Sequence, residues 1–117
     1  MDFLKNIFSR AQEEDNYIPV GAENLENAIR KSITVSGRVQ GVGFRFFTQG
    51  EGNKLRLTGW VKNLNNGDVT MEVQGAEQDV EELISRLKKG NGFSKVTDME
   101  IKDLPVDKEE KKLVIAY

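Results

Sequence analysis

Three glycines and two arginines lie within nine residues of this sequence, and together they could bind an anion. Gly37, Gly41 and Gly43 accept backbone torsions that other residues resist, so successive N–H groups can turn inward and form a concave nest. Arg38 and Arg45 stand near the two ends of the stretch, where a guanidinium can meet the oxygens of a phosphate or a carboxylate. Many glycine-rich stretches are plain turns, so the pattern predicts either a turn or an anion site.

A second polar candidate is Asn63, near the end of a segment that reads as a strand. An amide in a strand usually faces solvent or forms a turn, and its residue type alone assigns it no role. The glycines follow neither the GxGxxG nor the Walker spacing, and no acidic residue is placed to hold a ribose or Mg²⁺. Nucleotide binding is therefore disfavoured.

The 117 residues contain no histidine and no cysteine, which removes much of the chemistry that enzymes use. A disulfide, a thiolate nucleophile and a Cys-type zinc site need cysteine, and histidine is the commonest general base and metal ligand. Serine triads, papain-like dyads and zinc hydrolases are therefore excluded, and we expect neither a metal site nor a cofactor. The absence of cysteine suits the cytoplasm, where we expect the protein. No apolar stretch approaches the roughly 20 residues that span a bilayer.

The charge is uneven along the chain. Residues 1–31 hold six acidic and four basic residues and so carry the whole net charge of −2, while residues 32–117 are neutral. Within the neutral part, residues 37–66 hold five basic residues and one acidic residue. This local positive charge favours a small anion, whereas the overall balance lacks the basic excess expected of a nucleic-acid binder.

Residues 1–31 lack strand-like alternation and read as an N-terminal extension of a single domain formed by residues 32–117. Apolar residues at helical spacing predict a short amphipathic helix over residues 2–12, and the acidic residues 13–15 begin a linker. The apolar face of this helix either docks on a membrane surface or a partner protein, or packs on its own domain.

The pattern from residue 31 onward predicts alternating strands and helices. The clearest element is a helix over residues 77–89, where apolar residues recur at i, i+3, i+4 and i+7 and Gly90 supplies a stop. A second helix is predicted over residues 45–57, and strands over 32–37, 58–64, 68–74, 95–104 and 113–117. This order predicts an α+β ferredoxin-like fold (βαββαβ), a two-layer sandwich with two helices on a mostly antiparallel sheet of four to five strands.

Two segments of residues 32–117 resemble the acylphosphatase family in sequence, order and separation. The family consists of small, metal-independent hydrolases of carboxyl phosphates with a ferredoxin-like fold. The segments are Gly37-Arg38-Val39-Gln40-Gly41-Val42-Gly43-Phe44-Arg45 and Gly59-Trp60-Val61-Lys62-Asn63-Leu64-Asn65-Asn66-Gly67-Asp68-Val69.

The resemblance implies a division of roles among these residues. Backbone amides of a phosphate-binding loop cradle the phosphate, Arg45 clamps its oxygens and Asn63 orients the attacking water. The loop comprises Arg38, Val39, Gln40, Gly41, Val42, Gly43 and Phe44. The implied partners are a small-molecule acyl phosphate and inorganic phosphate, and we expect a monomer that binds no nucleic acid.

Other classes of function remain beside the enzyme. One alternative is a catalytically inactive anion-binding or interaction module of the same fold, and a minor one is an RNA-binding domain. Retention of both Arg45 and Asn63 favours the enzyme, because an anion binder has no need of a water-positioning amide. The sequence departs from the family at Gly50 and Gly52 in the first helix and at Arg56, where a glycine is common. These departures bear on stability rather than on chemistry.

Overall fold

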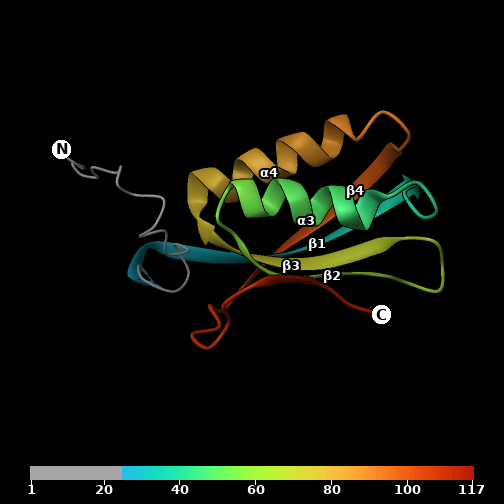
Figure 1. The fold of residues 1–117 in the computed structure, drawn as a ribbon. Coiled ribbons are helices and arrows are strands. Elements are labelled where there is room, and N and C mark those ends of the chain that lie inside the picture. The colour runs from blue at the N-terminus through green and yellow to red at the C-terminus, as the bar shows by residue number, and fades with distance from the viewer. Residues whose placement is uncertain (1–24) are drawn as a thin grey trace.

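A twisted sheet of five strands carries two helices on one face (Figure 1). The computed structural model describes residues 25–117. The elements, in chain order, are η2 (Leu25–Asn27), β1 (Ala28–Arg38), α3 (Phe44–Lys54), β2 (Thr58–Asn63), β3 (Val69–Ala76), α4 (Glu77–Lys89), β4 (Lys95–Leu104) and β5 (Leu113–Ile115). This order confirms the predicted ferredoxin-like plan, with β5 added at one edge. The helix predicted over residues 2–12 and the linker predicted from residue 13 lie outside the described residues.

The strands lie in the order β4-β1-β3-β2-β5. All neighbouring pairs are antiparallel except β2 with β5, which run parallel. Both β1 and β3 are therefore interior strands, and the loops that follow β1 and β2 emerge at the same end of the sheet. No helix within residues 25–117 is long and apolar enough to cross a membrane.

The core lies between the sheet and the two helices. Ile33 pairs across the strands with Met71, and Val35 with Val69, and all four side chains are fully buried. Because side chains alternate between the two faces of a strand, this register places one apolar row under the helices. The helix α4 covers that row with the buried side chains of Val80, Leu83 and Leu87, as its apolar stripe predicted.

Most element boundaries differ from the prediction by a few residues. The strand β1 begins at Ala28 rather than at residue 32, because its ladder with β3 continues to the pair Ala28–Ala76. The helix α3 ends at Lys54 rather than at residue 57. Arg56 has a φ of 60°, in the left-handed region, which an α-helix cannot accommodate. A glycine at this position would adopt that torsion without the steric cost of a Cβ.

Gly52 permits the close packing of α3 on β5. It is buried in α3, and a Cβ built on it would overlap the Cδ2 atom of Leu113, the first residue of β5. The glycine that lowers helix propensity therefore makes room for the edge strand.

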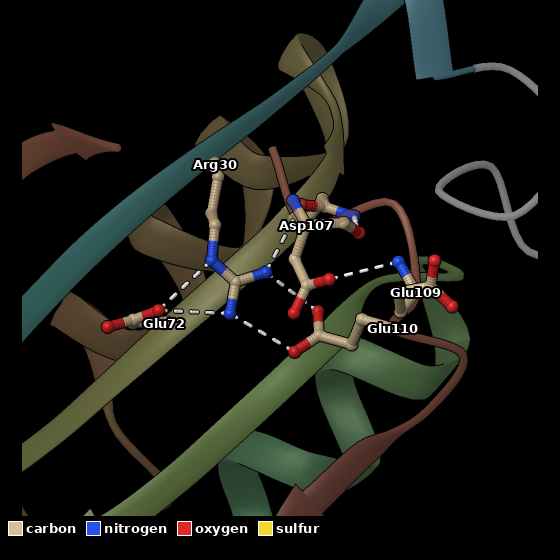
Figure 2. Close-up of polar contacts among 6 residues, drawn as sticks. Arg30, Glu72, Asp107, Glu109 and Glu110 are labelled. Carbon is tan, nitrogen blue, oxygen red and sulfur yellow. Dashed lines mark hydrogen bonds and ion pairs between the residues drawn. The ribbon is translucent and has the colours of Figure 1, made fainter. Parts of the chain in front are cut away.

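On the face of the sheet away from the helices, Arg30 anchors the connection between β4 and β5 (Figure 2). Its Nη1 lies 2.8 Å from Oε1 of Glu110 and 3.1 Å from Oε1 of Gln74, and its Nε lies 3.0 Å from Oε1 of Glu72. Burial opposes the charge of Arg30, but the hydrogen bonds and charges of Glu110 and Glu72 outweigh it and hold the pKa of the guanidinium above its ordinary value. The backbone of Asp107 adds two hydrogen bonds to the side chain of Gln74. The cluster thus fixes the segment that leads into β5.

Candidate active site

The loop of residues 38–44, between β1 and α3, contains a run of backbone amides that are not used in the sheet or the helix. Within residues 25–117, no hydrogen bond to the protein is found for the N–H groups of residues 39–43. Gly41 has a φ of 74° and Gly43 a φ of 76°, both in the left-handed region that L side chains rarely adopt. A stretch of amide donors without partners in such a turn is suited to binding an anion.

Arg45 stands in the first turn of α3, directly after this loop. The N-cap residue Gly43 makes no side-chain cap, so the positive end of the helix is open toward the loop. The Nη1 atom of Arg45 lies 3.4 Å from the carbonyl oxygen of Ala116, and its guanidinium carbon lies 4.9 Å from the centre of the Tyr117 ring. The 3.4 Å contact is a weak hydrogen bond, and no other hydrogen bond of this guanidinium is found within residues 25–117. Its remaining donors are available to an anion.

Asn63 is the last residue of β2, on the helix-covered face that it shares with Val61. It pairs with Val69, which in turn pairs with Val35 near the end of β1. The Oδ1 atom of Asn63 is shielded from solvent, and no hydrogen-bond partner for it is found within the described part of the chain. A buried acceptor without a donor is costly, and it is suited to accept a hydrogen bond from a bound water molecule.

Ala116 brings the Arg45 side of the site and the end of β2 together. Its carbonyl oxygen accepts the weak hydrogen bond from Arg45, and its N–H donates to the carbonyl oxygen of Val61 at 2.8 Å. Val61 lies two residues before Asn63. In Figure 1 the 38–44 loop, the β2–β3 turn and the C-terminal segment all lie at the right-hand end of the molecule. The fold thus gathers the arginine, the free amides and the unpartnered asparagine oxygen at one corner.

The side chain of Gln40 fixes the loop to the β2–β3 hairpin. Its Nε2 donates to the carbonyl oxygen of Leu64 at 2.7 Å and to that of Asp68 at 2.8 Å. The same hairpin begins directly after Asn63. The loop and the asparagine are therefore held in a fixed relation to each other.

The remaining predicted loop residues contribute in different ways. Val39 and Phe44 are each 1% exposed, so their side chains belong to the core. Arg38 is exposed at the end of β1, opposite Lys95 of β4. Its side chain adds positive charge near the loop, without a contact to Arg45 or Asn63.

Donors of this kind bind anions rather than cations. Within residues 25–117, no group of three or more His, Cys, Asp or Glu side chains is arranged to hold a metal ion.

The acidic residue on α3, Glu51, forms ion pairs with Lys54 and with Arg86 of α4. Partial burial opposes its charge, yet the hydrogen bonds from these two cations hold the pKa of the Glu51 carboxyl below its ordinary value. It joins the two helices.

Comparison with known proteins identifies the family. Residues 31–115 match the family model described as acylphosphatase. The chain is 57% identical over 89 residues to the acylphosphatase of Clostridium beijerinckii, an alignment that covers 76% of this chain and 99% of that protein. The chain belongs to the acylphosphatase family. Among solved acylphosphatases, that from Bacillus subtilis superposes with a TM-score of 0.73 at 39% identity and covers 76% of this chain and 99% of its own. The one from Coxiella burnetii gives 0.76 at 31%, covering 80% and 98%.

Two contacts of this candidate site in the acylphosphatase-family chain were not predicted from the sequence. Gln40 was expected to contribute its backbone, whereas its side chain also ties the loop to the hairpin. Asn91, from the loop between α4 and β4, donates a hydrogen bond to the carbonyl oxygen of Val42. The only sequence signal for either is an amide side chain next to a glycine, which is equally common in plain turns.

Proposed function

We propose that the amides of the 38–44 loop, together with Arg45 and Asn63, are the machinery with which this acylphosphatase-family chain hydrolyses carboxyl phosphates to carboxylate and phosphate. The observation that carries the proposal is the run of amides at residues 39–43, for which no acceptor is found within residues 25–117, directly before Arg45 at the open end of α3. These donors suit the oxygens of a transferring phosphoryl group, where charge gathers during the reaction.

The substrate itself reduces what the protein must supply. A carboxyl phosphate is a mixed anhydride, and its leaving carboxylate is stable as an anion above about pH 4. The leaving group therefore needs no general acid. Fixed amides and one guanidinium supply electrostatic stabilisation without a metal ion or a cofactor, which fits a chain that has no histidine and no cysteine.

Asn63 has the features of a water-positioning residue. Its Oδ1 is buried and has no hydrogen-bond partner within residues 25–117, so it can accept a hydrogen bond from a water molecule and hold the water in line with the phosphorus. An amide does not act as a base near neutral pH. We propose that an oxygen of the substrate phosphate accepts the proton that the water loses as the new P–O bond forms and the P–O bond to the carboxylate breaks.

The buried oxygen of Asn63 favours the enzyme over an inactive anion-binding module. A module that only binds phosphate needs donors, and a buried amide oxygen adds none. An enzyme, by contrast, can use the Asn63 oxygen as an acceptor that holds the attacking water.

We further propose that residues 32–117 form the catalytic unit and that it acts as a cytoplasmic monomer without nucleic acid. The neutral charge of residues 32–117 supports the last point, and the absence of cysteine suits a reducing compartment. Docking through residues 2–12 on a membrane surface or a partner protein stays a proposal of the same kind.

The deciding experiment is hydrolysis of benzoyl phosphate by the purified chain in excess chelator, beside the Arg45→Ala and Arg45→Lys variants. We expect turnover in chelator and a loss of about 100- to 1000-fold in Arg45→Ala, the usual effect of deleting one preorganised donor. Arg45→Lys keeps the charge but loses the planar guanidinium, so its turnover should lie between those of the wild type and Arg45→Ala. Near wild-type turnover in a folded Arg45→Ala protein would overturn the assignment.

A further inference from the structure

Asn91 contacts the 38–44 loop from outside the two segments that resemble the family. Its Nδ2 donates to the carbonyl oxygen of Val42 at 2.8 Å, across 49 positions of sequence. A Cβ built on Gly43 would lie 3.9 Å from the same nitrogen. The amide group of Asn91 therefore lies directly against the Val42–Gly43 peptide.

The orientation of the Asn91 side chain is fixed by its own loop. Its Oδ1 accepts hydrogen bonds from the N–H of Phe93 at 3.0 Å and of Ser94 at 2.9 Å, and its own N–H donates to Oγ of Ser94 at 3.2 Å. Because two N–H groups face Oδ1, the amide cannot be turned over without losing both, and Nδ2 must point toward Val42. The preceding residue, Gly90, closes α4 with a backbone hydrogen bond of 3.0 Å. Asn91 is thus a rigid support.

Because the peptide group is planar, a support that holds the Val42 carbonyl also sets the direction of the Gly43 N–H. No cis peptide bond occurs within the described residues, and in a planar trans peptide the C=O and the N–H point in opposite directions. Holding the carbonyl of Val42 toward Asn91 therefore points the N–H of Gly43 away from Asn91. The β4 strand that follows Asn91 forms one edge of the sheet, and β5, which leads to Ala116 and its contact with Arg45, forms the other. Pointing away from Asn91, the N–H of Gly43 can face the Arg45 side of the site.

We propose that Asn91 is a positioning residue of the active site, which holds the Val42 carbonyl so that the Gly43 amide faces the bound phosphate. The inference rests on the proposed function for the identity of that anion. Gln40 braces the loop from the β2–β3 hairpin, and Asn91 braces it from the α4–β4 loop. The amides between them are held from both sides before substrate arrives, which is the preorganisation that electrostatic catalysis requires.

The test compares four variants of the full chain. Asn91→Ala removes the whole contact, and Asn91→Asp keeps an oxygen for Phe93 and Ser94 but removes the donor to Val42. Phe93→Ala changes an exposed side chain of the same loop, in a residue that contacts Asn91 through its backbone N–H, and Phe93→Asp places a negative charge there as a control for charge alone. Each is measured for kcat and KM with benzoyl phosphate, for thermal unfolding, and for inorganic phosphate binding by following the amide resonances of Gly41 and Gly43.

We expect Asn91→Ala and Asn91→Asp to lower kcat/KM and phosphate affinity by about 10- to 100-fold, the effect of a misplaced group rather than a deleted one. The phosphate-induced shift of the Gly43 resonance should shrink more than that of Gly41, and both Phe93 variants should bind phosphate as the wild type does. A loss of melting temperature in Asn91→Ala with unchanged phosphate affinity and kcat/KM would overturn the proposal. Equal losses in Asn91→Asp and Phe93→Asp, with Asn91→Ala unaffected, would also overturn it.

The phosphate titration separates this proposal from the proposed function. If the wild type binds phosphate but does not hydrolyse benzoyl phosphate, the catalytic assignment fails, while the response of the Gly43 resonance in Asn91→Ala still decides the role of Asn91. If the wild type binds no phosphate, both are overturned.

Discussion

The guanidinium carbon of Arg45 lies 4.9 Å from the centre of the Tyr117 ring, although 71 positions separate Arg45 from the neighbouring contact at Ala116. A cation over an aromatic face is attracted by about 0.5–1 kcal/mol at an exposed site. The ring and the Ala116 carbonyl therefore restrain the guanidinium beside the free amides. This restraint gives the first of four predictions.

Replacing the Tyr117 ring should loosen Arg45 without removing it. We expect Tyr117→Ala to lower kcat/KM for benzoyl phosphate by about two- to fivefold, the equivalent of one exposed cation–π contact. Tyr117→Phe retains the ring and should behave as the wild type. A loss of equal size in Tyr117→Phe would show that the hydroxyl, not the ring face, is responsible.

Removing the buried acceptor of Asn63 should affect the chemical step. We expect Asn63→Ala to lower kcat about 10- to 100-fold, because water is no longer held in line, with little change in the inhibition constant of inorganic phosphate. Asn65→Ala, at an exposed position of the adjoining turn, is the matched control and should keep full activity. Parallel losses in kcat and in phosphate affinity would mean that Asn63 binds phosphate rather than water.

The buried cluster around Arg30 should contribute to stability. In Glu110→Gln the guanidinium loses an ionised partner, and we expect the free energy of unfolding to fall by about 1–3 kcal/mol in urea denaturation. Glu109→Gln, at the exposed neighbouring position, should leave the midpoint unchanged. A Glu110→Gln protein as stable as the wild type would show that Gln74 and Glu72 suffice to hold Arg30.

Glu51 should make stability depend on pH in the acid range. Its pKa is lowered in the folded protein from the ordinary value of 4.5, so the carboxylate form stabilises the folded state. This contribution is fully present above the ordinary value and is lost as the pH falls through the lower, folded-state pKa. We expect Glu51→Gln to reduce the melting temperature at neutral pH and to flatten its decline below pH 4.5, as measured by thermal unfolding across pH. A decline as steep as that of the wild type would assign the pH dependence to other carboxyls.

Local patterns in the sequence predicted the local parts of the fold. The helix α4 begins and ends where its apolar stripe, its charges and Gly90 place it, and β4 also has the predicted bounds. The predicted end of α3 was wrong because Arg56 adopts a left-handed torsion, which the spacing of apolar residues does not indicate. Family resemblance named Arg45 and Asn63, but composition and spacing alone left both open.

The contacts that hold the site together could not be read from any local pattern. Gln40 reaches Leu64 across 24 positions, Asn91 reaches Val42 across 49, and Arg30 reaches Glu110 across 80. Each is a hydrogen bond between side chains or backbone groups that only the completed fold brings together. An amide or a guanidinium shows its bonding capacity in the sequence but not its partner.

The run of free amides in the 38–44 loop has a consequence for how this chain can tolerate mutation. Every residue type except proline carries a backbone N–H, so exchanging a side chain there does not delete a donor. What selection must preserve is a set of torsion angles, and at Gly41, where a Cβ would meet nothing within 4 Å, the φ of 74° is the whole constraint. In a saturation library the loop should therefore tolerate Asn or Asp at Gly41 better than Ala or Val, since those side chains visit the left-handed region most readily. At Gly41 the chain therefore requires a backbone conformation and no particular functional group.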